Sequence, residues 1–286
     1  MKLDKGVTRG AAACAAVAVM AAAAMPAAAA EWSDTSIGWR YGKKFREPFN
    51  PDDVSKNILN LTHASGYKYG SNFFNVDLLM SDSKDPSTVG GSGAQEAYVV
   101  YRNTVSLGKV TAKEYKYGGV VRDFGGTFGF DWNTKNDVGY ASKKRMLVLG
   151  PTVMFDVPGF LNASVLALRE SNAPLGHPDR YTYKTHPMLA LGWGIPIGSS
   201  PFSFEGFALF IASKGKDEFG GDTKPETNID AQIMLDVGAV TGGPKGTFKV
   251  GFEYQWWKNK FGNDSSGPAG SGAFAKTPMI RAEYHF

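Results

Sequence analysis

Cysteine is almost absent from this chain, and long apolar runs are absent after its first thirty residues. The single cysteine, Cys14, lies in an N-terminal segment that we expect to be removed. The remaining chain would then form no disulfide and no cysteine-ligated metal site. After Ala30 no stretch reaches about eighteen uninterrupted apolar residues, which excludes a helical membrane span. Segments with helical periodicity are also missing there, so the composition favours an exported all-β protein.

The first thirty residues have the composition of a secretory signal peptide. A basic start is followed by a run rich in Ala and Val, and three small residues before position 31 form a cleavage site. We therefore predict a signal peptide at 1–30, one domain at 31–286, and export to the cell outer membrane. A membrane anchor is the alternative, but the apolar run is short and weakly apolar. The basic start consists of Lys2, Lys5 and Arg9.

Positive and negative charges are nearly balanced. The chain has 31 basic and 27 acidic residues, and the predicted signal peptide holds three and one of these, which leaves 28 and 26. A nucleic-acid-binding protein would need a clustered basic face, which the sequence does not suggest. We therefore expect no nucleic acid polymer as a partner.

Apolar and polar residues alternate in segments of about ten residues throughout the remaining chain. This period of two is typical of a membrane strand that has one face toward lipid and the other toward the lumen. We therefore predict an all-β fold, a transmembrane antiparallel β-barrel of about twelve strands. Segments 160–170 and 201–213 are apolar on both faces over part of their length, so their orientation stays open. The predicted strands are 34–42, 56–64, 70–81, 95–106, 118–131, 144–157, 160–170, 184–197, 201–213, 227–240, 246–259 and 275–286.

The connections and the C-terminus support the barrel. Short turns are predicted at 157–159, 198–201 and 242–244, and long polar loops alternate with them in the second half of the chain. A strand ending on Phe286 resembles the signal read by the machinery that inserts outer-membrane barrels. We therefore expect that machinery and outer-membrane lipid as partners. A soluble β-sandwich is the alternative, but one face of the strands carries too many large apolar residues for contact with water.

Polar side chains opposite the apolar faces mark the predicted lumen. A charge in the lipid band destabilises a barrel by about 2–4 kcal/mol, so these residues should face inward. They would either line a polar channel that binds a small solute or form a salt-bridged interior that fills the barrel. Trp257 would either stack on a planar solute or fill space. The candidate substrate-binding residues on the lumen wall are Asp230, Gln232, Asp236, Glu253, Gln255, Trp257, Arg102 and Arg281. The aromatic residues expected to face outward are Trp39, Tyr41, Trp193, Tyr254, Trp256 and Tyr284.

No catalytic or metal-binding pattern stands out. A G-x-S-x-G motif is missing, and no histidine is followed by a second histidine or a cysteine at the spacing of metal ligands. We therefore expect no enzymatic activity, no metal and no cofactor. The histidines are His63, His177, His186 and His285.

Four stretches together resemble the nucleoside-specific channels of bacterial outer membranes (Tsx-like outer envelope proteins). They are HASGYKYGSNFFNVD at 63–77, LGP with DVPGF at 149–160, GFEYQWWKNKFG at 251–262, and the terminal strand. The resemblance implies a narrow twelve-stranded barrel that passes nucleosides by passive diffusion. We therefore predict a channel for small polar solutes, with nucleosides as the suspected substrate. A non-conducting structural or adhesive barrel is the alternative.

Overall fold

The computed structural model describes residues 30–90, 93–177 and 179–286, so the predicted signal peptide lies outside the described residues except for Ala30. The described residues form twelve long strands and one strand of two residues. The strands are β1 (Ala30–Glu47), β2 (Asn50–Tyr67), β3 (Gly70–Ser81), β4 (Gln95–Ser106), β5 (Val121–Lys135), β6 (Arg145–Phe155), β7 (Phe160–Asn172), β8 (Tyr181–Thr182), β9 (His186–Pro196), β10 (Phe202–Ile211), β11 (Glu226–Asp236), β12 (Phe248–Lys258) and β13 (Phe274–His285).

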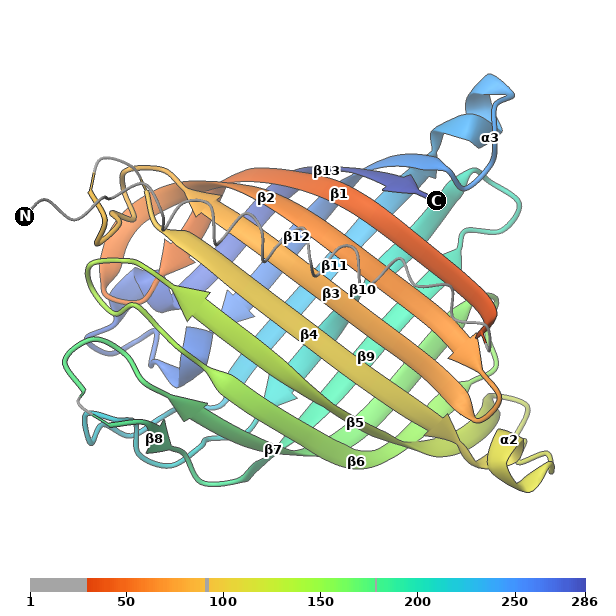
Figure 1. Ribbon diagram of the computed structural model, residues 1–286, viewed down its shortest axis with the longest axis horizontal. Coiled ribbons are helices and arrows are strands. Elements are labelled where there is room, and N and C mark those ends of the chain that lie inside the picture. Colours follow the sequence, from red (N-terminus) through yellow and green to blue (C-terminus); the bar gives the residue numbers. More distant parts are fainter. Residues whose placement is uncertain (1–29, 91–92, 178) are drawn as a thin grey trace, which may run out of the picture.

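The long strands form a closed antiparallel barrel (Figure 1). Each long strand pairs with the next one along the chain, and β1 pairs with β13 to close the sheet. The short β8 adds only two pairs to the end of β7. The prediction of a twelve-stranded all-β barrel is therefore confirmed. Such closure leaves no exposed sheet edge, which is the condition for a β-structure to cross a membrane.

The two ends of the barrel differ, and we call them the turn end and the loop end. At the turn end, where the C-terminus lies, connections as short as 68–69 and 156–159 occur beside two longer ones with the helices α2 (Leu107–Thr111) and α3 (Val237–Thr241) (Figure 1). At the loop end, the β12–β13 connection contains the 3-10 turns η1 (Lys260–Gly262) and η2 (Gly270–Ala273).

The predicted strand 227–240 is present as β11, but its predicted end and the predicted short turn at 242–244 are wrong. β11 ends at Asp236, whose carboxylate accepts hydrogen bonds from the backbone N–H of Ala239 at 3.2 Å and of Gly246 at 2.8 Å. A capping carboxylate of this kind starts a helix, and here it starts α3.

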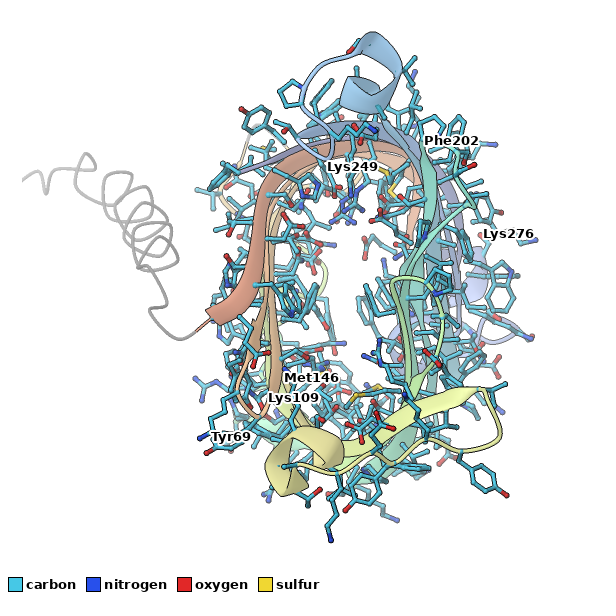
Figure 2. The ribbon with its side chains drawn as sticks, turned by 90° about the vertical axis from the view of Figure 1, so that its right-hand side faces the viewer. Tyr69, Lys109, Met146, Phe202, Lys249 and Lys276 are labelled. Carbon is cyan, nitrogen blue, oxygen red and sulfur yellow. The ribbon has the colours of Figure 1, made fainter. Side chains whose placement is uncertain are left out.

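Strand alternation separates an apolar outer face from a mixed inner face. Leu147 and Leu149 of β6 are 62% and 65% exposed, as expected for side chains that meet lipid acyl chains. Figure 2 shows Phe202 and Lys276 pointing outward, whereas Met146 and Lys249 point toward the interior. The predicted inward and outward faces of the last three strands agree with this arrangement, because directly paired residues share one face of a sheet.

A bulge in β1 changes which residues face inward near the loop end. The pairing of β1 with β2 shifts between Gly42 and Phe45. Tyr41 therefore lies on the outer face, whereas Phe45, also an odd-numbered residue, is buried in the interior at 5% exposure.

Two apolar clusters fill parts of the interior in the half nearer the loop end. Both consist of side chains from the inner face. The second cluster contains residues of segments 160–170 and 201–213, which explains why these segments are apolar on two faces. One cluster contains Phe45, Val54, Ile58 and Met279, and the other contains Val148, Leu166, Leu168 and Met188 with Leu209 and Ile211 packed against it. Among the described residues no helix is long and apolar enough to cross a membrane.

Candidate functional site

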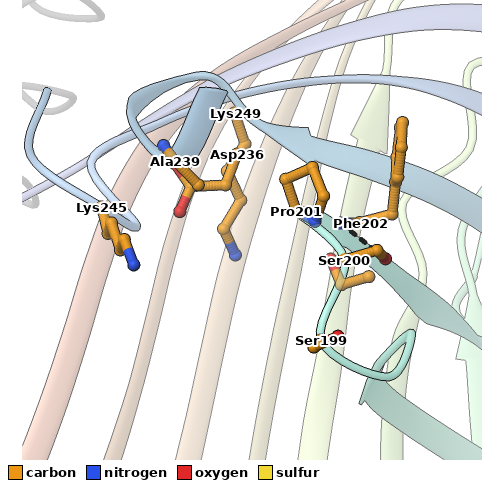
Figure 3. A pocket seen from close by; sticks show the side chains of 9 residues that line it. Ser199, Ser200, Pro201, Phe202, Asp236, Ala239, Lys245 and Lys249 are labelled. Atoms are coloured by element: carbon orange, nitrogen blue, oxygen red, sulfur yellow. Dashed lines mark hydrogen bonds between the residues drawn. The ribbon is translucent and has the colours of Figure 1, made fainter. Parts of the chain in front are cut away.

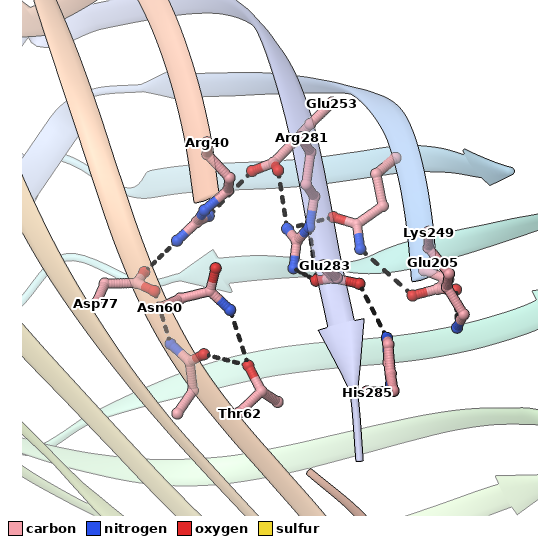
Figure 4. A network of polar contacts seen from close by, with 12 residues as sticks. Arg40, Asn60, Thr62, Asp77, Glu205, Lys249, Glu253, Arg281, Glu283 and His285 are labelled. Atoms are coloured by element: carbon pink, nitrogen blue, oxygen red, sulfur yellow. Dashed lines mark hydrogen bonds and ion pairs between the residues drawn. The ribbon is translucent and has the colours of Figure 1, made fainter. Parts of the chain in front are cut away.

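A buried glutamate connects two arginines at the centre of the inner wall (Figure 4). Glu253 of β12 is fully buried; its two carboxylate oxygens accept hydrogen bonds from Arg40 at 3.0 Å and from Arg281 at 2.8 Å. Arg40 of β1 also pairs with Asp77 of β3 at 2.6 Å. These contacts join β3, β1, β13 and β12, including strands that are not neighbours in the sheet. Each non-neighbouring pair spans one intervening strand, β2 or β13, on the inner face.

The same network continues along the wall toward β10. Arg281 donates to the Gln232 amide oxygen at 2.7 Å, and the Gln232 amide nitrogen lies 3.4 Å from Glu205. Lys249 lies 3.4 Å from the same glutamate. Burying an ion is costly unless it is paired, so the alternation of cations, anions and amides is what permits so many charges here. We call this set, from Asp77 through Glu253 and Arg281 to Lys249, the inner-wall network.

The structure brings five of the predicted site residues together. Asp230 and Gln255 are directly paired in the sheet, and the Gln255 amide donates to the Asp230 carboxylate at 3.2 Å. The next inward-facing pair along the two strands is Gln232 and Glu253, which are also directly opposite each other. Arg281, on the next strand, completes the group.

The other three predicted residues lie elsewhere. Arg102 of β4 pairs with Asp131 of β5 and donates to the carbonyl oxygen of Phe130 at 3.1 Å. Asp236 lies at the rim, where it caps α3. Trp257 lies at the loop end, and its indole N–H donates to Glu226 at 2.6 Å.

The faces of the Trp257 ring already have neighbours. The Phe261 ring lies 4.9 Å from it at 76°, and the Lys260 ammonium lies 4.8 Å from its centroid. A solute could stack on Trp257 only if these two side chains moved.

Sequence reasoning missed two residues of the lumen wall. Arg40 lies between Trp39 and Tyr41, so the alternation that places these two aromatics outside would also have placed Arg40 inside. Phe207 of β10 is directly opposite Asp230 and is 37% exposed. It was hidden because its strand is apolar on both faces.

Phe207 borders an open part of the lumen. Its partner on β9 is Gly192, and a side chain placed there would meet no atom within 4 Å. On the next strand Gly192 pairs with Asn162, whose buried amide oxygen has no hydrogen-bond partner within the described residues. An aromatic face, open space and a free acceptor therefore lie in one row across three strands.

Solvent access differs between the two halves of the lumen. In the half nearer the turn end, Phe73 is 41% exposed. In the half nearer the loop end, Lys56, Leu168 and Met188 are only 2%, 2% and 3% exposed. Buried inward residues also occur near the turn end, such as Thr152 at 2% and Met154 at 8%, so water reaches only the part of that half beside Phe73 and Phe207.

A pocket at the turn-end rim adds cationic and hydroxyl groups to this entrance (Figure 3). It has a volume of about 390 Å³ and lies between the β9–β10 turn and the start of α3. Lys245, Lys249, Ser199 and Ser203 line it together with Asp236. In the part of the chain that the structure describes, no group of three or more His, Cys, Asp or Glu side chains is arranged to hold a metal ion.

No family model matches this chain, and no curated protein matches it. Among solved structures it is similar to KdgM porin, with 10% identity, a TM-score of 0.43, and coverage of 88% of this chain and 99% of that one. It is also similar to outer membrane phospholipase A from Escherichia coli (8% identity, TM-score 0.49, 91% and 93% covered). The translocator domain of the autotransporter NalP from Neisseria meningitidis is another such structure (12% identity, TM-score 0.39, 97% and 98% covered).

These likenesses give no basis for carrying an activity over to this chain, because the TM-scores are below 0.5. The class of protein follows from the structure itself. A closed antiparallel barrel with an apolar outer face and a charged, hydrogen-bonded interior is an outer-membrane-type β-barrel.

Proposed function

We propose that this barrel is an outer-membrane channel for the passive diffusion of small polar solutes, with nucleosides as the substrate. The observation that carries the proposal is the water-accessible part of the lumen, where polar groups and the exposed ring of Phe207 face inward. A polar lining of this kind has no stabilising role toward lipid, but it lowers the cost of transferring a hydrated solute from water.

A neutral solute fits the charges of the wall. The inner-wall network contains Arg40, Arg281 and Lys249 beside Asp77, Glu205 and Glu253. Glu283 pairs with Arg281 next to the network, so cations and anions nearly cancel. A pore lined in this way has no strong preference for ions of one sign. Selectivity would then come from shape and hydrogen bonding.

A nucleoside is a planar base joined to a sugar with hydroxyl groups. Phe207 offers a face on which a base can stack, and such stacking is worth about 1–3 kcal/mol in nucleic-acid-binding proteins. Asp230 and the amide oxygen of Asn162 lie in the same row of the wall; both are buried, so they accept hydrogen bonds from a solute only after their side chains rotate toward the lumen. The resemblance of the sequence to nucleoside-specific channels supports the same substrate.

The test is a planar bilayer recording with purified protein. We expect steady single-channel conductance that millimolar nucleoside reduces, and weaker reduction in the Phe207→Ala variant. Phe210→Ala is the matched control, because Phe210 belongs to the same strand and is 40% exposed, but it faces lipid. If nucleosides leave the current of the unmodified protein unchanged, the substrate is wrong while a general solute channel survives.

A non-conducting structural barrel is the second candidate. The burial of the lumen side chains near the loop end favours it. A complete lack of conductance, for the unmodified protein and for variants with an altered loop end, would support this alternative.

A further inference from the structure

The β12–β13 connection folds back into the mouth of the barrel. Lys260, in η1, lies with its ammonium group 2.7 Å from the carbonyl oxygen of Arg46 and 3.2 Å from a carboxylate oxygen of Glu47. Both acceptors belong to the end of β1. Lys260 is only 4% exposed, although it lies in a connection between strands. A loop that extended away from the barrel would leave this lysine in water.

Phe261 reaches from the same connection to the far wall. Its ring centroid lies 3.7 Å from the ammonium of Lys144, which immediately precedes β6. In the order of the sheet, β6 is separated from β12 by β7, β9, β10 and β11. The pair Lys260 and Phe261 therefore contacts opposite sides of the mouth, and we call these two residues the mouth bridge.

Ion pairs hold both ends of the mouth bridge. Glu47 contacts Lys56 at 2.6 Å and Lys135 at 3.3 Å in addition to Lys260. At the other end, Lys144 lies 3.5 Å from Glu170, a glutamate that also contacts Lys214 at 2.8 Å. Each glutamate thus balances more than one lysine. The charges at this end depend on one another, and losing one contact changes the others.

The backbone of the mouth bridge is held in an unfavourable conformation. Phe261 has a φ of 61°, in the left-handed region that a bulky residue with a Cβ rarely adopts. Side-chain contacts at both walls must compensate for this, since a backbone in such a region is strained. No strand pairing depends on the mouth bridge, because β12 ends at Lys258 and β13 begins at Phe274. The connection can therefore move outward without breaking the pairing between strands.

We propose that Lys260 and Phe261 form the gate of the lumen, closing the loop end when they are packed and opening it when they swing outward. The inference rests on the proposed channel function. Solute would then cross only while the mouth bridge is released.

Thiol labelling tests the gate separately from conductance. Ser203→Cys places a reporter on the inner face near the turn end, in a chain whose own cysteine lies in the predicted signal peptide. The protein is placed in vesicles with the loop end outward, an orientation checked by cleavage at the exposed Lys216. A small charged thiol reagent is then added outside or enclosed inside.

The gate variant is Phe261→Gly, and the matched control is Phe49→Gly. Both phenylalanines lie at the loop end with a left-handed backbone, at φ of 61° and 65°, so glycine relieves strain in both. Phe49, however, is 68% exposed and lies outside the mouth. We expect labelling from outside to be several-fold faster in Phe261→Gly than in the parent or the control. Single-channel conductance should rise in the same variant.

The remaining outcomes separate the two proposals. Equal labelling of parent and Phe261→Gly from outside would overturn the gate and leave the channel standing. Labelling of Phe261→Gly only by enclosed reagent would also overturn the gate. If no reagent labels the reporter from either side, the lumen is not open to water, and both the gate and the channel fail. Heat-modifiable migration in gels confirms that each variant is folded.

Discussion

The charge of Lys260 should make the closed gate sensitive to pH. Burial, together with the repulsion of the neighbouring Lys56 and Lys135, lowers the pKa of Lys260 from its ordinary 10.5 to about 8 against the attraction of Glu47 and Glu96. In an open gate the side chain returns to water and regains its ordinary pKa. Between pH 8 and 10.5 the closed form therefore binds fewer protons than the open form, so raising the pH favours closure.

The size of this effect follows from the two pKa values. The difference between 10.5 and about 8, at about 1.4 kcal/mol for each unit of pKa, amounts to roughly 3 kcal/mol. At pH 7 this free energy disfavours the closed gate, and it is relieved by about pH 10. The ratio of closed to open gates should therefore rise by about a hundredfold across that range, since about 1.4 kcal/mol corresponds to a factor of ten.

Replacing Lys260 with methionine removes the titrating group and keeps a side chain of similar length. Glu47 remains paired with Lys56 and Lys135, so no buried charge is left alone. We expect the Lys260→Met protein to be closed more of the time at pH 7 and to lose the dependence on pH. Open probability in planar bilayers, recorded at half-unit steps from pH 7 to 10.5, measures both effects.

Two results would refute this reasoning. The first is a Lys260→Met protein whose open probability still falls with pH as in the parent, which would assign the titration to another group. The second is an open probability that rises with pH in the parent, because that is opposite to the sign required by a lowered lysine pKa. The Phe49→Gly protein should keep the parent's dependence on pH.

Two further predictions concern the fold. Phe252→Lys, at an outward position that is 56% exposed, should destabilise the barrel by about 2–4 kcal/mol in denaturant titrations in lipid vesicles, because a charge then faces acyl chains. Gln255→Lys, at an inward position on the same strand beside Asp230, should reduce the free energy of unfolding by less than about half of that amount. Equal losses of stability in the two variants would contradict the assignment of faces. Removing Phe286, which is 69% exposed and contacts β1 through its backbone N–H, should reduce assembly in cells but leave stability after refolding unchanged. A matching loss of stability would instead indicate a packing role.

The sequence by itself determined the strands and most of their faces. Alternation with a period of two places Phe252 outside and Glu253 inside whatever the rest of the chain does, because successive side chains of a strand point to opposite sides. Strand 95–106 was predicted with the bounds that β4 has. Alternation failed at 237–240, where α3 replaces the end of the predicted strand, and it left the orientation open where the inner face is also apolar, as around Leu166 and Phe207. There, both faces look alike from the sequence.

The tertiary structure alone decided which inward side chains meet. Alternation gives a residue's face, but it does not give its height in the barrel or its partner across the lumen. Arg40 and Glu253 are more than two hundred residues apart, and strand order and register bring them to 3.0 Å. The bulge that turns Phe45 inward and the connection that carries Phe261 into the mouth likewise depend on contacts with distant strands. These contacts are non-local, so no segment of sequence contains the information that fixes them.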